Sequence, residues 1–311
     1  METAVLLIAY NRPDLVERRL KELAASELIP KNVFLSVDGL KESAGNSHKN
    51  SYSSMLAALN LPFIVNENYR QVNLGCSRHI ITAVTEVLKD FESVIIVEDD
   101  VSISPCFLNS LYEALSIAAK MNDIGTIGGF SNFHKQLHFP FFFRNNYWRK
   151  TKYFSAWGWA TTRDFWKHFV EVKDIEDIEI FLSRSAYWTE LSERKRNIWL
   201  KRFKRGVWDF NVQLILFKYS KLNLLPALRI IDNEGFSDKR STHTKHNRPR
   251  NLFGIGKSNT SPTVIKDLNS TLMLKFFWDF VDSNLWAADG LFNARARETG
   301  LRTWLRSIFV K

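Results

Sequence analysis

The sequence predicts an α/β protein with a mainly parallel sheet flanked by helices. Over the first 100 residues, short apolar runs rich in Val, Ile and Leu alternate with stretches of helical periodicity, as in chains of β-α units. The chain has 311 residues, of which 45% are hydrophobic, including 24 Phe and 10 Trp. A chain of this size and composition can bury a sizeable core, which excludes intrinsic disorder and a small disulfide scaffold.

The expected elements follow one another in order. Residues 4–9 (AVLLIA) read as a buried strand, and Pro13 suits the first turn of a helix with Val16, Leu20 and Leu23 on one face. The next elements are strands at 33–37 and 63–66, a helix at 77–89 and a strand at 94–97. After about residue 105 this alternation weakens, and aromatic, glycine-rich and basic stretches predict loops that carry function.

We expect one large domain with an appendage rather than two domains. The domain covers residues 1–247, and residues 248–311 form a linker, which begins with a polar stretch, and a helical C-terminal region. No internal repeat is evident in the sequence.

Charge and cysteine content narrow the class of protein. The chain has 43 Lys and Arg against 33 Asp and Glu, a net charge of +10, which favours an anionic partner without identifying it. Cys76 and Cys106 show neither a disulfide framework nor a metal-binding spacing. The N-terminus lacks the pattern of a signal peptide, and no apolar run reaches the ~18 residues that span a bilayer. We therefore expect a cytoplasmic protein.

Three consecutive carboxylates, Glu98, Asp99 and Asp100, follow the apolar run at 94–97. Their charges repel one another, and a cation would relieve that repulsion. Hard oxygen ligands suit Mg²⁺ or Mn²⁺, which typically complete their coordination shell with substrate phosphates. The alternative is a solvated acidic turn. Asp38 also follows an expected strand, and ligands of open α/β sheets bind beyond the carboxyl ends of the strands.

Other motifs allow two interpretations each. Residues 254–258 (GIGKS) lack the first glycine and the preceding strand of a phosphate-binding P-loop, which we reject. His243 and His246 suit either metal ligation or a polar loop. Residues 157–159 (WGW) suit either core packing or a sugar platform, and Asp209 either a general base or a helix-capping carboxylate.

Taken in order, these segments resemble metal-dependent glycosyltransferases of the GT-A fold, and most closely the N-acetylglucosaminyltransferase I family and related bacterial sugar transferases. The matching segments cover about residues 5–244. They are LLIAYNRPDLVERRLKEL, LSVDG, SRHIITAV, VIIVEDDVSISPCFL, YFSAWGWATTRDFW, VWDFN and NEGFSDKRSTHT. The resemblance implies a Rossmann-like nucleotide-sugar-binding domain, with a nucleotide-binding half at 1–104 and an acceptor and catalytic half at 105–247.

The resemblance also implies roles for individual residues. Asp100 would bind a Mn²⁺ or Mg²⁺ ion that bridges the donor's diphosphate, with His243 near the same diphosphate. Glu98 and Asp99 would contact the sugar and the ribose. The nucleotide would be bound by Arg12, Asp38, Arg78 and His79. Because Asp38 can accept a hydrogen bond from a uracil N–H, a UDP-sugar such as UDP-GlcNAc is the expected donor.

In the resembled family, an Asp of a Trp-Asp-Asp motif removes the acceptor's proton, and attack from the opposite face inverts the anomeric centre. Here the motif is Trp-Asp-Phe at 208–210, which makes Asp209 the candidate base. Trp157, Gly158 and Trp159 match a loop beneath the reacting sugar, where indole faces pack on sugar C–H groups.

The sequence therefore predicts an inverting glycosyltransferase that acts on a glycan or lipid-linked acceptor in bacterial surface polysaccharide or glycolipid assembly. One alternative is a protein of the same fold that lost catalysis and binds carbohydrate or membrane. Another is a nucleotidyltransferase, although AYNRPD lacks the glycine-rich loop that such an enzyme needs. A nucleic-acid binder is disfavoured because no recognition motif is evident.

Two basic, amphipathic stretches suggest a peripheral membrane contact on the inner face of the plasma membrane. In the C-terminal stretch, an apolar face of Leu301, Trp304, Leu305, Ile308 and Phe309 is flanked by basic residues. In the second, 194–205, basic residues surround Ile198, Trp199 and Phe203. The alternative for both is that the apolar faces pack on the domain.

Overall fold

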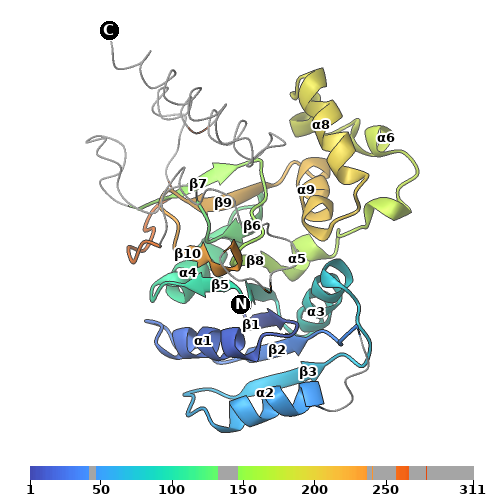
Figure 1. The fold of residues 1–311 in the computed structure, drawn as a ribbon. Coiled ribbons are helices and arrows are strands. Elements are labelled where there is room, and N and C mark those ends of the chain that lie inside the picture. Colours follow the sequence, from blue (N-terminus) through green and yellow to red (C-terminus); the bar gives the residue numbers. More distant parts are fainter. Residues whose placement is uncertain (42–46, 132–145, 237–239, 241–256, 266–277, 279–311) are drawn as a thin grey trace.

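The computed structural model describes residues 1–41, 47–131, 146–236, 240, 257–265 and 278. Within these residues, an eight-stranded mixed sheet in the order β3-β2-β1-β4-β8-β6-β9-β7 runs through the molecule (Figure 1). Its first four strands belong to the N-terminal part of the chain and its last four to the part after residue 105. The expected α/β class with helices on both faces of the sheet is confirmed.

The N-terminal strands are β1 (Thr3–Ala9), β2 (Val33–Val37), β3 (Val65–Tyr69) and β4 (Ser93–Glu98), and they run parallel to one another. In the register, Ala9 lies beside Val37, and Ile8 lies beside Glu98. The residues that follow β1, β2 and β4 therefore leave the sheet at the same edge, as parallel strands require.

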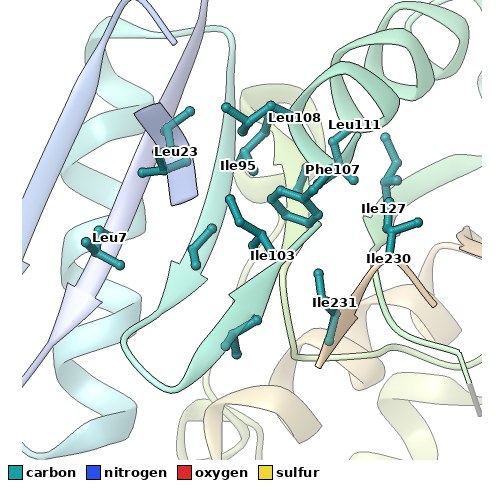
Figure 2. Packing of buried hydrophobic residues seen from close by; sticks show 14 of the residues in the cluster. Leu7, Leu23, Ile95, Ile103, Phe107, Leu108, Leu111, Ile127, Ile230 and Ile231 are labelled. Carbon is teal, nitrogen blue, oxygen red and sulfur yellow. The ribbon is translucent and has the colours of Figure 1, made fainter. Parts of the chain in front are cut away.

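Alternation along the strands explains how both faces of the sheet are buried. Val5, Leu7 and Ala9 contribute to one cluster with α1 (Pro13–Ala24), α2 (Ser47–Ala57) and α4 (Phe107–Ala118). Ala4, Leu6 and Ile8 contribute to the other with α3 (Cys76–Asp90), α5 (Arg163–Trp166) and α9 (Trp208–Lys218). Figure 2 shows part of the first cluster, where Phe107 of α4 packs among isoleucines from distant strands.

The second half of the sheet is mixed. Its strands are β6 (Ile124–Gly128), β7 (Trp148–Thr151), β8 (Trp159–Thr162) and β9 (Leu222–Pro226). β8 pairs antiparallel with both β4 and β6, β6 pairs parallel with β9, and β7 pairs antiparallel with β9. The β4–β8 pair joins the two halves into one sheet. A separate two-stranded ribbon consists of β5 (Val101–Ile103) and β10 (Ile231–Asn233).

Short helices form a third layer beside α9 (Figure 1). They are α6 (Ile178–Leu182), α7 (Ala186–Thr189), α8 (Glu193–Phe203) and a 3-10 turn at Val172–Asp174. A second 3-10 turn, Glu234–Phe236, lies beside β5 instead. Trp199 and Phe203 of α8 are buried against Phe217 of α9. Among the described residues, none of the helices combines the length and apolarity that crossing a bilayer would require.

Most of the elements expected from the sequence are present, with small shifts. The third strand begins at Val65 rather than residue 63, and helix α2 was not expected. Most of the linker and C-terminal region, 248–311, lies outside the described residues. The amphipathic stretch at 301–309 and residues 254–256 of the GIGKS segment are among the residues that are not described. Of the described part, Ile265 bridges to Trp148, and Trp278 is buried with its indole N–H donating to the Tyr147 hydroxyl at 3.0 Å.

Candidate active site

The candidate site lies at the carboxyl edge of the N-terminal strands. Arg12 follows β1, Asp38 follows β2, and Glu98 ends β4 directly before Asp99 and Asp100. The parallel register brings these three chain segments side by side. The acidic triplet therefore lies at the carboxyl edge of the sheet, as its position after an apolar strand predicted.

Arg12 holds the acidic turn to the beginning of α1. Its Nε donates to Oδ2 of Asp99 at 3.1 Å, its Nη2 donates to the other Asp99 oxygen, and Nη2 also lies 3.3 Å from Oδ2 of Asp100. Asp99 is buried, and this burial raises its pKa to about 7, with Asp100 adding to the rise and Arg12 opposing it. The Arg12 backbone N–H donates to the Tyr52 hydroxyl at 3.2 Å, so α2 supports the same turn.

Several carboxylates act electrostatically on Cys76, at the N-terminus of α3. Cys76 reaches solvent, yet the pKa of its thiol is raised to about 12, first by desolvation and then by nearby negative charge. The charges are those of Glu98, Asp209, Asp100 and Asp38. Glu98 itself has a pKa well above its ordinary value, because of desolvation and then repulsion from Asp100, Asp99 and Asp209. The triplet and Asp209 thus belong to one strongly acidic site.

The carboxylate of Asp100 lies against the backbone of Gly235. A Cβ added to Gly235 would stand 2.5 Å from Oδ2 of Asp100 and 2.9 Å from Oδ1 of Asn233. The Asp100 carbonyl also accepts a hydrogen bond from the Glu234 N–H at 2.7 Å, and Asn233 Oδ1 accepts one from the Gly235 N–H at 2.8 Å. A side chain at residue 235 would therefore force the Asp100 and Asn233 side chains to move, and the sequence pattern did not single this glycine out.

Ion pairs fix the same segment to α1. Glu234 lies 3.3 Å from Nη2 of the buried Arg19 and 3.7 Å from Nη1 of Arg18. Arg240 makes two hydrogen bonds, of 2.8 and 2.9 Å, to the carboxylate of Asp14. Helix α1 therefore positions both sides of the site, through Arg12 at its beginning and through these pairs along its length.

Asp209 lies in the first turn of α9 and acts electrostatically on Glu98. Its Oδ1 accepts a hydrogen bond from the Phe210 N–H at 3.0 Å, and burial raises its pKa. Arg205 and Arg202 partly offset that rise. The N-terminus of α9 meets that of α3, where the Trp208 N–H lies 3.4 Å from the Ser77 hydroxyl. A carboxylate with a raised pKa, held near other acids, is chemically suited to accept a proton.

Asp38 and His79 have protein partners. The Asp38 oxygens accept from the N–H groups of Gly39, Leu74 and Gly75, each at 2.9 Å. His79 is buried on α3, and its Nε2 lies 2.8 Å from the Ser36 hydroxyl. Burial lowers the pKa of His79 to about 4, so the ring is neutral at pH 7.

These partners give both residues a structural role in shaping the edge, and their contact with a nucleotide remains a prediction. Arg78, the neighbour of His79, is exposed on α3.

The WGW segment is divided between core and surface. Trp159 begins β8 and is fully buried, with ring contacts to Phe154 and Trp208, so in this structure its indole packs the core. Trp157 is half-buried and stands edge-on to the Phe130 ring at 4.8 Å. Gly158 has a φ of 55°, and a Cβ added to it would lie 3.0 Å from Ile231, so a side chain there would be strained. Sugar contact by Trp157 and Gly158 remains a prediction.

The oxygen atoms near Asp100 show whether this site could bind the expected metal ion. Within the part of the chain that the structure describes, no group of three or more His, Cys, Asp or Glu side chains is arranged to hold an ion. Mg²⁺ and Mn²⁺ sites need only one or two carboxylates when substrate phosphates complete the shell. Asp100 and Glu98 offer such oxygens, and their repulsion favours a cation, so these residues fit the ion. His243 and His246 lie outside the described residues.

The sequence model of the GNT-I family matches residues 1–173, which is more than half of the chain. The chain belongs to the GNT-I family. None of the curated proteins compared with the sequence matches it.

Solved structures show more distant likenesses. A mannosyltransferase from Pyrobaculum calidifontis, in complex with GDP-Man and Mn²⁺, is 15% identical with a TM-score of 0.36, over 52% of this chain and 45% of that one. S. aureus TarS 1–349 is 14% identical with a TM-score of 0.38, over 73% and 57%. Glucosyl-3-phosphoglycerate synthase from Mycobacterium tuberculosis, with Mn²⁺ and UDP, is 10% identical with a TM-score of 0.33, over 52% and 57%. This chain therefore spans less than two thirds of each of these proteins, and the likenesses are remote.

Proposed function

We propose that this protein transfers a sugar from a nucleotide-sugar donor, a UDP-sugar such as UDP-GlcNAc, to a hydroxyl group of a glycan or lipid-linked acceptor, with inversion. The observation that carries this proposal is the convergence of the acidic triplet with Asp209 in one site at the carboxyl edge of the sheet. Membership of the GNT-I family supports it.

Each residue of the site would have its own role in the reaction. Asp100, with Glu98 beside it, would hold a Mn²⁺ or Mg²⁺ ion, which would supply a Lewis acid for the charge that develops on the diphosphate leaving group. Arg12 keeps Asp99 in place through two hydrogen bonds and so fixes the turn that presents Asp100. The backbone at Gly235 sets the position of the Asp100 carboxylate from the other side.

Asp209 would accept the proton of the attacking hydroxyl. Burial raises its pKa, which makes it a stronger base than an exposed aspartate. Inversion is what the resemblance to the N-acetylglucosaminyltransferase I family implies. We place this reaction in bacterial surface polysaccharide or glycolipid assembly at the cytoplasmic face of the membrane, a setting supported by the resemblance and by the charge of +10.

The test is a donor screen that follows release of the free nucleoside diphosphate from UDP-, GDP- and CMP-activated sugars, with and without Mn²⁺. We expect release from a UDP-sugar that needs the metal and that is lost in Asp100→Ala. Asp164→Ala is the matched control, because Asp164 is exposed and pairs only with the nearby Lys167 among the described residues. Metal-independent release, or equal loss in both variants, would overturn the assignment. Donor binding without release in the presence of varied acceptors would favour the catalytically inactive alternative.

A further inference from the structure

Helix α8 presents a row of basic side chains on its outer face. Arg194 and Lys201 of α8 are exposed, and so are Lys204 and Arg205, which follow its last residue, Phe203. None of the four makes an ion pair with another residue that the structure describes. We call these four residues the α8 basic stripe. From Arg194 to Lys204 it extends about 15 Å at 1.5 Å per residue.

The opposite face of α8 is fixed in the core. Trp199 and Phe203 are buried, and their rings stack on each other at 5.6 Å. Of the two interpretations of the stretch at 194–205, core packing is therefore the one that the structure shows for these two aromatic residues. They are not free to enter a lipid layer, so the exposed face of α8 offers charge with little apolar surface.

The C-terminal end of the stripe reaches the candidate base. The guanidinium of Arg205 lies 5.5 Å from the centre of the Phe210 ring, and that of Arg202 lies 5.9 Å from it. Phe210 is the neighbour of Asp209, and both arginines act electrostatically on the Asp209 carboxylate. The stripe thus leads along α8 to the point where an acceptor hydroxyl would lose its proton.

We infer that the α8 basic stripe is the docking surface for an acceptor that is a linear, phosphate-bearing chain with free hydroxyl groups. This inference rests on the proposed function. Exposed cations in a row that make no ion pair with the residues that the structure describes fit the repeated negative charges of phosphodiesters. Glu193, at the N-terminal end of α8, is the acid nearest to the stripe on this helix and lies at the end away from Asp209.

A linear chain fits these observations better than a membrane surface. The stripe is one helix wide, and it points toward Asp209 instead of forming a broad plane. A membrane contact of this size would also gain from apolar insertion, which the buried Trp199 and Phe203 cannot provide.

The first experiment measures binding of fluorescently labelled inorganic polyphosphate without donor. We expect the wild type to bind polyphosphate in a salt-sensitive manner. The affinity should fall about tenfold in the triple variant Arg194→Gln/Lys201→Gln/Lys204→Gln, because each exposed ion pair with a phosphate contributes modestly and three are removed together. The control is Lys31→Gln/Lys89→Gln/Lys120→Gln, which removes the same charge from exposed residues near the opposite, amino edge of the strands. We expect it to change binding less than about twofold. Equal loss in both variants would overturn the inference.

The second experiment compares transfer from radiolabelled UDP-sugar to poly(glycerol phosphate) and to a neutral glucan. We expect incorporation into the phosphate chain, with kcat/KM reduced about tenfold in the stripe variant and retained in the control variant. Preference for the neutral glucan would overturn the inference. A further contrary result would be that the stripe variant loses the wild type's sedimentation with phosphatidylglycerol vesicles but binds polyphosphate as the wild type does.

Metal-dependent UDP release by the wild-type protein is measured in parallel. If it is absent, the proposed function fails. If it is present and the stripe has no effect on phosphate-chain binding, only this inference fails. Thermal unfolding of each variant confirms that loss of binding is not loss of fold.

Discussion

Gly235 lies in contact with the carboxylate of Asp100, so close that a Cβ would stand 2.5 Å from its Oδ2. These residues are far apart in the chain, yet the ribbon of β5 and β10 brings them together. The position of the last carboxylate of the triplet is therefore controlled from the opposite half of the protein.

Gly235→Ala should displace the Asp100 carboxylate, because the added methyl group and Oδ2 cannot occupy their present positions. We expect affinity for UDP in the presence of Mn²⁺ to fall about tenfold, the equivalent of about 1.4 kcal/mol, which is within the usual cost of overpacking. Isothermal titration with and without Mn²⁺ measures this, and the midpoint of thermal unfolding serves as the control for folding. Equal metal-dependent affinity in wild type and variant would contradict a positioning role for Gly235.

Asp209→Asn keeps the shape of the side chain and removes its capacity to accept a proton. We expect donor affinity to be nearly unchanged and turnover to fall by roughly 10²-fold or more, the scale of losing a general base. In the wild type, kcat/KM should fall as pH drops through a pKa higher than that of an ordinary aspartate, because burial raises the pKa of Asp209 and the protonated form is inactive.

Steady-state rates across pH provide the measurement. Turnover retained in Asp209→Asn would exclude this residue and direct attention to Asp232 on β10. Asp232→Asn is therefore the natural companion variant.

Asp38→Asn should destabilise the edge that leads into α3. An amide keeps one acceptor but turns an NH₂ group toward backbone N–H donors of Leu74 or Gly75, which leaves buried donors unpaired. We expect a loss of about 2 kcal/mol in the free energy of unfolding, measured by urea denaturation. A variant with unchanged stability and altered preference among nucleotide bases would instead support direct contact between Asp38 and the base.

His79 should make stability depend on pH in the acid range. The pKa of His79 is lowered by burial from 6.5 to about 4, so the unfolded chain binds more protons than the folded protein between these values. Its contribution is complete above about pH 6.5 and is lost as pH falls toward 4. From pH 7 to 5 the loss is about 2 kcal/mol.

His79→Gln, which can still bond to Ser36, should make the decrease in unfolding free energy between pH 7 and 5 shallower by that amount. Urea unfolding at several pH values gives the comparison. An identical slope in wild type and variant would show that the ring is protonated without cost and is not held neutral by burial.

Much of the N-terminal half of the fold was accessible from the sequence because β1, β2 and β4 are nearly uniform apolar runs, whereas the polar β3 was placed less well. Val33–Val37 begins and ends where the pattern indicated. Helix α2 was missed because SHKNSYSSMLA is mostly polar, with Tyr52 in the core and Met55 and Leu56 only partly buried against it. The strands of the second half are three to five residues long, too short for alternation to identify.

The acidic part of the site was predictable because all three carboxylates are adjacent and follow a strand. The partners that control them were not, since Arg12 is 87 residues from Asp99 and no local pattern encodes that pair. Gly235 gave only a weak signal, a glycine between Glu234 and Phe236 in a polar segment. The buried state of Trp159 also depends on tertiary packing, which the WGW motif alone does not determine.

The ribbon of β5 and β10 has a consequence for synthesis of the protein. Ser102 and Asp232, which face each other in it, are 130 residues apart, so the ribbon closes a large loop and can form only after most of the domain has been made. A nascent chain that ends before residue 231 contains all three acidic residues of the turn but lacks the segment that fixes Asp100. Ribosome-bound fragments should therefore neither sequester nucleotide sugars nor compete for metal, and these capacities should arise together, late in translation.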